Sequence, residues 1–233
     1  MLWLASRDSL YEAAGAPWPT SLPIAERAVL FDGLAAKRLG WNSNLFSLQI
    51  PIPASTIRVI GVAGWSVNRP LTAAEAGVRI GSTWQPRQPL VIDGTTAAIV
   101  LDEQATGVQY LFGTGVSGTE MTFGEIFFGA GTPLPDPSSV ELVTEVPTIV
   151  NGDFAVRVGL PRREVRMAWP PQESRAIEDW VRTYGGETGL LWVDGRPFFG
   201  RLGTTVSSLR TIEHDYLELA SVSLVEVAGG SLW

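Results

Sequence analysis

The chain has 233 residues, of which 45% are hydrophobic and 18% charged, a composition that predicts a globular protein with a substantial core. Its net charge of −7 argues against a broad basic surface, so we expect no sequence-specific binding of nucleic acid. The absence of cysteine excludes disulfides, thiolate nucleophiles and cysteine-ligated zinc.

The first forty or so residues give weak signals. The opening MLWLASRDS lacks a basic region and a long apolar run, so we expect no signal peptide, and no later run is long enough for membrane insertion. The first thirty or so residues, with three prolines between residues 17 and 23, are expected to form either an extended arm or a packed lead-in. Helical patterns before the middle of the chain are short, at residues 25–34 and 71–76.

Strands dominate the prediction from Leu45 to Gly129. Apolar residues alternate through LFSLQIPIP and fill TIRVIGVAGW, which predicts two strands between Leu45 and Trp65. The chain's 25 glycines and 16 prolines fit many short strands joined by turns. Further strands are expected at residues 78–80, 90–92, 97–101, 108–112 and 122–128. This number of strands is enough for a β-sandwich.

A domain boundary is predicted between Gly129 and Ser139, in the sequence GAGTPLPDPSS. Its three prolines lack the amide donor that a helix or a central strand needs. We therefore predict two domains, residues 1–134 and 135–233. The alternative is a long loop within one continuous sandwich.

The second domain should combine strands with one helix. RREVRMAW at residues 162–169 is read as a strand, and a helix is expected at Gln172–Tyr184, between Pro171 and a Gly-Gly stop. One stripe of this helix is apolar: Ala176, Ile177, Trp180, Val181 and Tyr184. Asp194-Gly195 predicts a two-residue hairpin turn. In the closing strand, DYLELASVSLVEV, the alternation of apolar and polar residues shifts near Ala220, which suggests a bulge.

The sequence offers no convincing catalytic set. The one histidine, His214, adjoins Asp215 on a predicted strand, where neighbouring side chains point to opposite faces. Glu120 and Glu125 resemble a glycosidase pair in type, but Glu125 interrupts an apolar strand and is expected on an exposed strand face. Metal-ligand spacings are missing, and the glycines at 113–118 lack the lysine of a phosphate loop. We expect no enzymatic activity, no metal and no cofactor.

Nine tryptophans are unusual for this length. Aromatic side chains dominate cores and subunit interfaces, and we favour that role. A sugar-stacking platform on one face of the sandwich is the alternative.

Two parts of the chain resemble proteins of bacteriophage tails. Residues 45–129, with IPASTIRVIGVAGWSVN, GVRI and MTFGEIFFG, resemble the galactose-binding, jelly-roll sandwich of minor tail proteins from long-tailed phages. The last third, with one helix, a hairpin and a final strand ending in SLVEV, resembles the ring-forming domain of tail tube and distal tail proteins. The resemblance implies a mainly β fold: a jelly-roll sandwich followed by a tail-tube-like β module with one flanking helix. The ring domain comes first in many distal tail proteins, whereas here the sandwich leads.

The resemblance also implies a function. It indicates a structural virion protein of the tail tip or baseplate, made in the host cytoplasm, that forms a homo-oligomeric ring, most simply a hexamer, between the tail tube and the hub or fibre. Open sheet edges in the second domain would supply the contacts. The alternative role for any one of the charged residues expected at this interface is solvated surface charge. The candidates are Arg162, Arg163, Arg166, Arg196, Glu218 and Glu226. The rival interpretation is a carbohydrate-binding module or adhesin, with glycan contact through the N-terminal domain.

Overall fold

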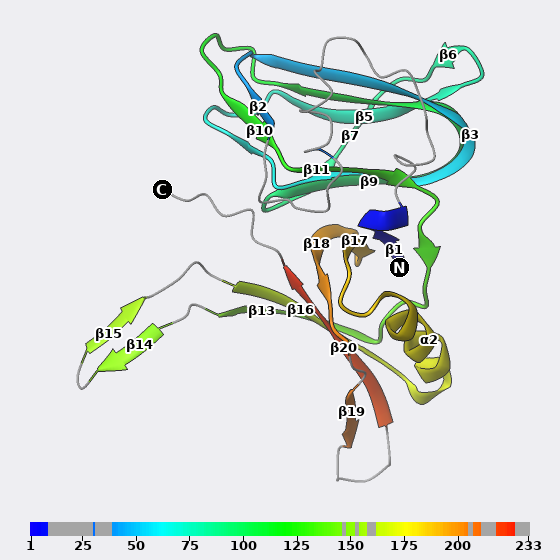
Figure 1. The fold of residues 1–233 in the computed structure, drawn as a ribbon, viewed down its shortest axis with the longest axis vertical. Coiled ribbons are helices and arrows are strands. Elements are labelled where there is room, and N and C mark those ends of the chain that lie inside the picture. Colours follow the sequence, from blue (N-terminus) through cyan, green and yellow to red (C-terminus); the bar gives the residue numbers. More distant parts are fainter. Residues whose placement is uncertain are drawn as a thin grey trace.

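The computed structural model describes residues 1–8, 30, 39–145, 148–151, 154–157, 162–204, 207–210 and 218–226 (Figure 1). Within these ranges the fold is mainly β, as predicted, and is built from several antiparallel sheets. The helices in the described part of the chain are the α-helix α2 (Ser174–Tyr184) and the short 3-10 helices η1 (Ser6–Asp8) and η3 (Pro171–Glu173). The strands form an N-terminal module, residues 39–129, and a C-terminal module around an eight-stranded sheet.

The N-terminal module is organised around two long, bent strands that pair along most of their length. These are β3 (Leu45–Ala63) and β9 (Thr96–Gly113). The rest of their sheet comprises β5 (Ala73–Ile80), β6 (Thr83–Trp84), β7 (Gln88–Pro89), β8 (Val91–Asp93) and β11 (Glu125–Gly129). A three-stranded sheet is formed by β2 (Leu39–Trp41), β10 (Met121–Phe123) and β4 (Ser66–Val67).

The bend divides the β3–β9 pair into two layers, which Figure 1 shows one above the other. In one layer, the first half of β3 pairs with the second half of β9, which pairs in turn with β5. In the other layer, the second half of β3 lies between the first half of β9 and β11. Register shifts between Pro51 and Ser55 and between Ile57 and Val59 allow the bend. A core that includes Phe46, Ile60 and Phe128 fills the space between the layers.

Two local expectations for this module were wrong. The two strands predicted between Leu45 and Trp65 are one strand, because the bulges bend the chain without ending the ladder. The helical pattern at 71–76 falls largely in β5, where Ala73–Arg79 pair with β9. Pairing on a sheet outweighs the helix propensity of a short alanine-rich segment.

The C-terminal module is an eight-stranded sheet with the strand order β12-β1-β17-β18-β20-β16-β13, in which β19 also pairs with β20. Its strands are β1 (Leu2–Ala5), β12 (Thr132–Pro133), β13 (Ser139–Glu145), β16 (Arg162–Trp169), β17 (Thr188–Val193), β18 (Arg196–Leu202), β19 (Ser207–Arg210) and β20 (Glu218–Glu226). A separate hairpin of β14 (Thr148–Asn151) and β15 (Phe154–Arg157) projects from the body (Figure 1).

The position of β1 differs from an extended N-terminal arm and agrees with the alternative, a packed lead-in, for residues 2–5. Residues 2–5 pair with β17, and residues 2 and 3 also pair with β12. The start of the chain therefore completes the C-terminal sheet, and the N-terminal module is inserted between β1 and β12.

The helix and the hairpin are confirmed. η3 and α2 together cover residues 171–184, and the turn between β17 and β18 has positive φ at Asp194 (50°) and Gly195 (71°). The bulge expected near Ala220 is wrong, because β20 pairs with β16 in unbroken register from Ala220 to Val225. On its other side, β20 pairs with β19 at Glu218–Ser221 and with β18 at Leu224–Glu226.

The predicted linker is held against the C-terminal sheet. The Leu134 amide donates to the Met1 carbonyl at 3.0 Å, and the Trp169 indole donates to the Pro135 carbonyl at 3.0 Å. The amide of Ser138 donates to the Ala168 carbonyl at 2.8 Å. These bonds leave little freedom between β12 and β13.

Tryptophans in the core support the favoured role for these residues. Trp3, Trp169 and Trp180 are buried together between the sheet and α2, with ring centroids 5.8 Å apart for Trp3 and Trp180 and 6.2 Å apart for Trp169 and Trp180. The other four tryptophans among the described residues are partly buried.

Candidate functional site

The two modules meet through an apolar interface. Residues that alternate along β3, β9 and β11 face away from the N-terminal core and contact the eight-stranded sheet. The rings of Phe127 and Phe199 lie 5.2 Å apart across this contact. The buried cluster consists of Leu4, Val59, Ala63, Ala98, Phe127, Leu190 and Phe199. The modules are thus packed together and not merely tethered.

Gly61 lies at a close approach between the two modules. A Cβ placed on Gly61 would lie 2.9 Å from the Ala98 Cβ, 3.0 Å from the Ala97 carbonyl oxygen and 3.0 Å from a Leu190 methyl carbon. Only a residue without a side chain lets β3, β9 and β17 come this close.

Beside the apolar interface, one arginine bridges two carboxylates. Arg163 on β16 contacts Asp93 of the N-terminal module at 2.8 Å and Glu226 at the end of β20 at 3.1 Å. The side chains of Arg163, Asp93 and Glu226 are 25%, 16% and 10% exposed. The Arg163 guanidinium also lies over the Phe198 ring, 5.9 Å from its centroid. We call these three charged residues the ionic triad.

The ionic triad carries two negative charges and one positive charge when fully ionised. Burial raises the pKa of Glu226 to about 6, Arg163 acts to lower this pKa, and Asp93 acts to raise it. Desolvation of the carboxylate therefore outweighs the attraction of the shared guanidinium.

A second feature is the outer edge of β13. Among the described residues, β13 pairs with β16 on one side and with no strand on the other. Val140 and Leu142 lie opposite the buried Met167 and Val165, so all four share one face of the sheet. Val140 is nevertheless 37% exposed and Leu142 is 42% exposed. The apolar face of the sheet therefore continues to an uncovered edge.

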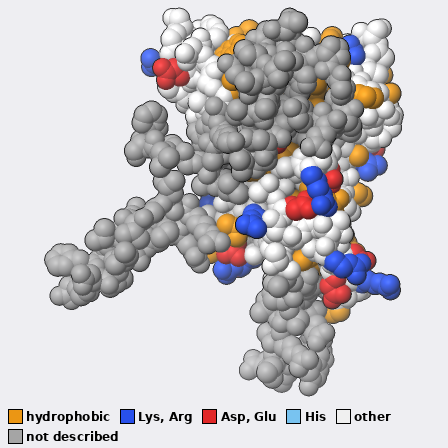
Figure 2. Space-filling model, viewed as in Figure 1, with side chains coloured by type: hydrophobic (Ala, Val, Ile, Leu, Met, Phe, Trp, Pro, Cys, Tyr) orange, Lys and Arg blue, Asp and Glu red, His pale blue; other side chains and the backbone are white. Residues whose placement is uncertain are grey.

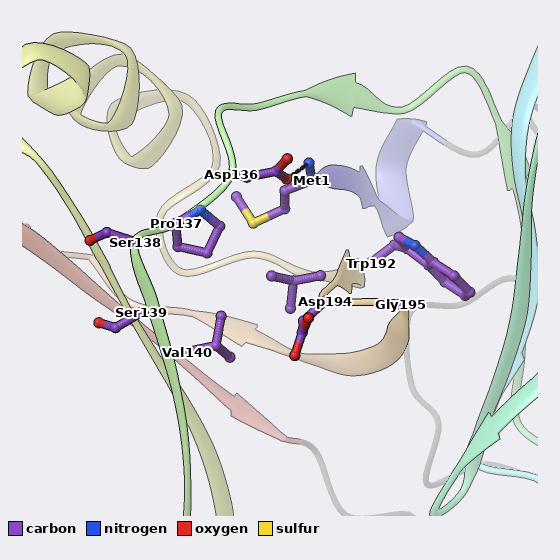
Figure 3. A pocket seen from close by; sticks show the side chains of 10 residues that line it. Met1, Asp136, Pro137, Ser138, Ser139, Val140, Trp192, Asp194 and Gly195 are labelled. Atoms are coloured by element: carbon purple, nitrogen blue, oxygen red, sulfur yellow. Dashed lines mark hydrogen bonds and ion pairs between the residues drawn. The ribbon is translucent and has the colours of Figure 1, made fainter.

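A hollow adjoins this edge (Figure 3). It has a volume of about 550 Å³ and lies between the start of β13 and the β17–β18 turn. The Met1 amine pairs with Asp136 on its rim, while the ring of Trp192 points away from that pair. The hollow is lined by Met1, Trp192 and residues 136–140 and 193–195. Its mixed lining does not indicate a particular ligand.

The structure separates the residues expected at the oligomer interface. Arg163 and Glu226 pair within one chain, and Arg166 contacts Glu164 at 3.2 Å on the opposite face of β16. Arg196 is exposed next to the β17–β18 turn. Arg162 and Glu218 begin β16 and β20, where they pair through the backbone with Glu145 and Arg210 respectively. On the face in Figure 2, blue and red side chains lie beside one another without forming a patch of one sign.

The candidate catalytic residues gain no support. His214 and Asp215 lie outside the described residues. Glu120 is exposed, but Glu125 is fully buried, so its expected exposed position was wrong. The reason is that β11 is covered on both faces, by the N-terminal core at Ile126 and Phe128 and by the eight-stranded sheet at Phe127.

The described ranges contain no group of three His, Asp or Glu residues placed to hold a metal ion. In the same ranges, no helix is both long and apolar enough to cross a bilayer.

Sequence reasoning missed Asp93, Val140 and Leu142. Asp93 precedes Gly94 in a turn between β8 and β9, and the Asp-Gly pair is a hairpin signal. Val140 and Leu142 alternate with Glu141 in SVELVTE, a strand pattern that follows directly on the proline-rich segment.

Comparison of the chain with models of protein families, with curated proteins and with solved structures found no match.

Proposed function

We propose that the protein is a structural subunit of a bacteriophage tail tip, where copies of its C-terminal module join into a homo-oligomeric ring between the tail tube and the hub or fibre. The single observation that carries this proposal is the open, apolar edge of β13. The phage context comes from the sequence resemblance, and so does the expectation of six subunits and a jelly-roll N-terminal module.

An open strand edge with apolar side chains favours addition of a strand from another chain. The outward N–H and C=O groups of β13 need partners, and covering Val140 and Leu142 removes apolar surface from water. The opposite edge of the sheet is less suited, because β12 has two residues and one is Pro133, which has no N–H to donate.

The order of the strands is compatible with a closed ring. β13, β16, β20 and β19 are antiparallel from one neighbour to the next. A contact between β13 of one copy and β19 of the next keeps this alternation, because each copy contributes an even number of strands. Such a contact joins different surfaces head to tail, and contacts of this type form a ring when the rotation between successive copies closes.

The test is assembly of the full chain. Sedimentation velocity and native mass spectrometry should show a discrete oligomer, and the double variant Val140→Lys/Leu142→Lys should be monomeric with an unchanged circular dichroism spectrum. The matched control is Leu45→Lys/Val116→Lys, which changes a similarly exposed Leu and Val in the N-terminal module and should still assemble. A full chain that stays monomeric at high concentration, with no ring of it in images of tails, refutes the proposal.

The rival, a carbohydrate-binding module, predicts a different result. No described tryptophan is fully exposed, and the partly buried Trp84 has its ring covered by Arg79, at 5.4 Å from the centroid. Glycan-array binding by a monomeric full chain would favour the rival.

A further inference from the structure

We propose that the ionic triad of Asp93, Arg163 and Glu226 is a proton-sensitive clamp between the two modules, which tightens when the carboxylate pair takes up one proton. This device is independent of ring formation, because all three residues belong to one chain and lie at the contact between its modules.

The geometry makes the two carboxylates compete for one cation. A guanidinium nitrogen, Nη2, of Arg163 lies 2.8 Å from Asp93, while its Nε lies 3.1 Å from Glu226. The Arg163–Glu226 pair joins neighbouring strands of one sheet, whereas the Arg163–Asp93 pair joins the two modules. Only the second pair contributes directly to docking.

Docking changes the environment of Glu226 in one direction. In the docked state the negative Asp93 shares Arg163 with Glu226, and the Glu226 side chain is only 10% exposed. Both effects disfavour the charged carboxylate. The pKa of Glu226 is raised to about 6, which is the direction that these two effects predict.

Protonation of Glu226 and docking of the modules are therefore linked. The docked state holds a proton on Glu226 more tightly than an open state in which Glu226 is solvated, so proton uptake favours docking. This additional stability of the docked state is present at pH 5 and is lost as the pH rises through about 6. When Glu226 is neutral, Arg163 is left to Asp93 alone, and the bond between the modules is strengthened.

The surroundings of the triad supply no second cation among the described residues. β16 provides Arg163, β8 provides Asp93 and β20 provides Glu226. On β18, Phe198 stacks with Arg163, and Gly200 lies opposite Glu226 in register. The nearby Arg201 of β18 instead donates to the Gly186 carbonyl at 2.8 Å.

The clamp can be tested by hydrogen exchange of the full chain at pH 5 and pH 8, with rates corrected for intrinsic pH dependence. Amides of β8 and β18, which face each other across the contact, should be about tenfold better protected at pH 5, since one pKa unit corresponds to a factor of ten. Glu226→Gln, which mimics the neutral acid, should show the higher protection at both pH values.

Two further variants separate the clamp from a general effect of pH. Asp93→Asn removes the competition but not the burial of Glu226, so the pH dependence at β8 and β18 should become smaller, and both strands should be less protected than in the unchanged chain at pH 5. Glu75→Gln breaks a Glu–Arg pair within the N-terminal module, 3.4 Å from Arg87, and should leave the pH dependence intact. Equal protection at both pH values in the unchanged chain, or an unaltered pH dependence in Glu226→Gln, overturns the proposal.

Discussion

Replacing Phe199 with alanine measures how strongly the two modules hold each other. The side chain is 2% exposed and lies between Leu4, Leu190 and Phe127 in the interface cluster. Removal of a buried phenylalanine from a packed core costs about 3–5 kcal/mol. For a chain of this length, about 2–4 °C of melting temperature corresponds to each kcal/mol. We therefore expect melting to fall by roughly 6–20 °C.

The neighbouring residue provides the control. Phe198 is 3% exposed but faces the other side of β18, in the core shared with α2. Phe198→Ala should destabilise the C-terminal module by a similar amount. The two variants differ in what opens: hydrogen exchange in Phe199→Ala should rise at β11 and β3, whereas in Phe198→Ala it should rise around α2. Differential scanning calorimetry with a melting temperature for Phe199→Ala within about 2 °C of the unchanged chain would refute a stabilising interface.

Two other predictions follow from buried positions. Gly61→Ala should destabilise the protein by about 1–3 kcal/mol in urea titrations. The added Cβ would press on the Ala97 carbonyl and the Ala98 Cβ, which cannot move independently of β9. An unchanged midpoint would show that the strands separate easily. Tyr110→Phe should cost about 1 kcal/mol, because the hydroxyl donates to the Phe127 carbonyl at 2.8 Å. Burial also raises the pKa of Tyr110 well above its usual value of 10, so the unfolded state ionises first and stability should fall above about pH 10. The Phe variant should show a smaller alkaline loss of stability, and an equal loss would contradict this assignment.

Local patterns predicted the regular parts of the fold. The stripe of Ile177, Trp180 and Val181 gave the helix, and all three are buried. Asp194-Gly195 gave the hairpin because both positions require positive φ. These features depend on residues close in sequence, where periodicity and turn chemistry act directly.

Features that depend on distant residues were missed or misread. The run VIGVAG was read as strand, but its burial on both faces requires a second sheet, which is supplied by Leu190 and Phe199. The charge of Arg163 was assigned to a contact between subunits, whereas a turn of the N-terminal module brings Asp93 to it within one chain. The open edge of β13 also depends on which strands pair elsewhere. None of these partners is visible in a single local window.

The position of β1 has a consequence for how the chain is made. β1 is synthesised before the N-terminal module, yet its partner β17 follows that whole module and α2. Until β17 leaves the ribosome, Trp3 lacks the helix and sheet that bury it. The N-terminal module can form its own strand pairs earlier, since β3, β9, β5 and β11 all lie between β1 and β12. Closure of the C-terminal sheet by β1 is therefore a late, long-range event in folding. Until then β1 is unpaired and can form non-native contacts during synthesis.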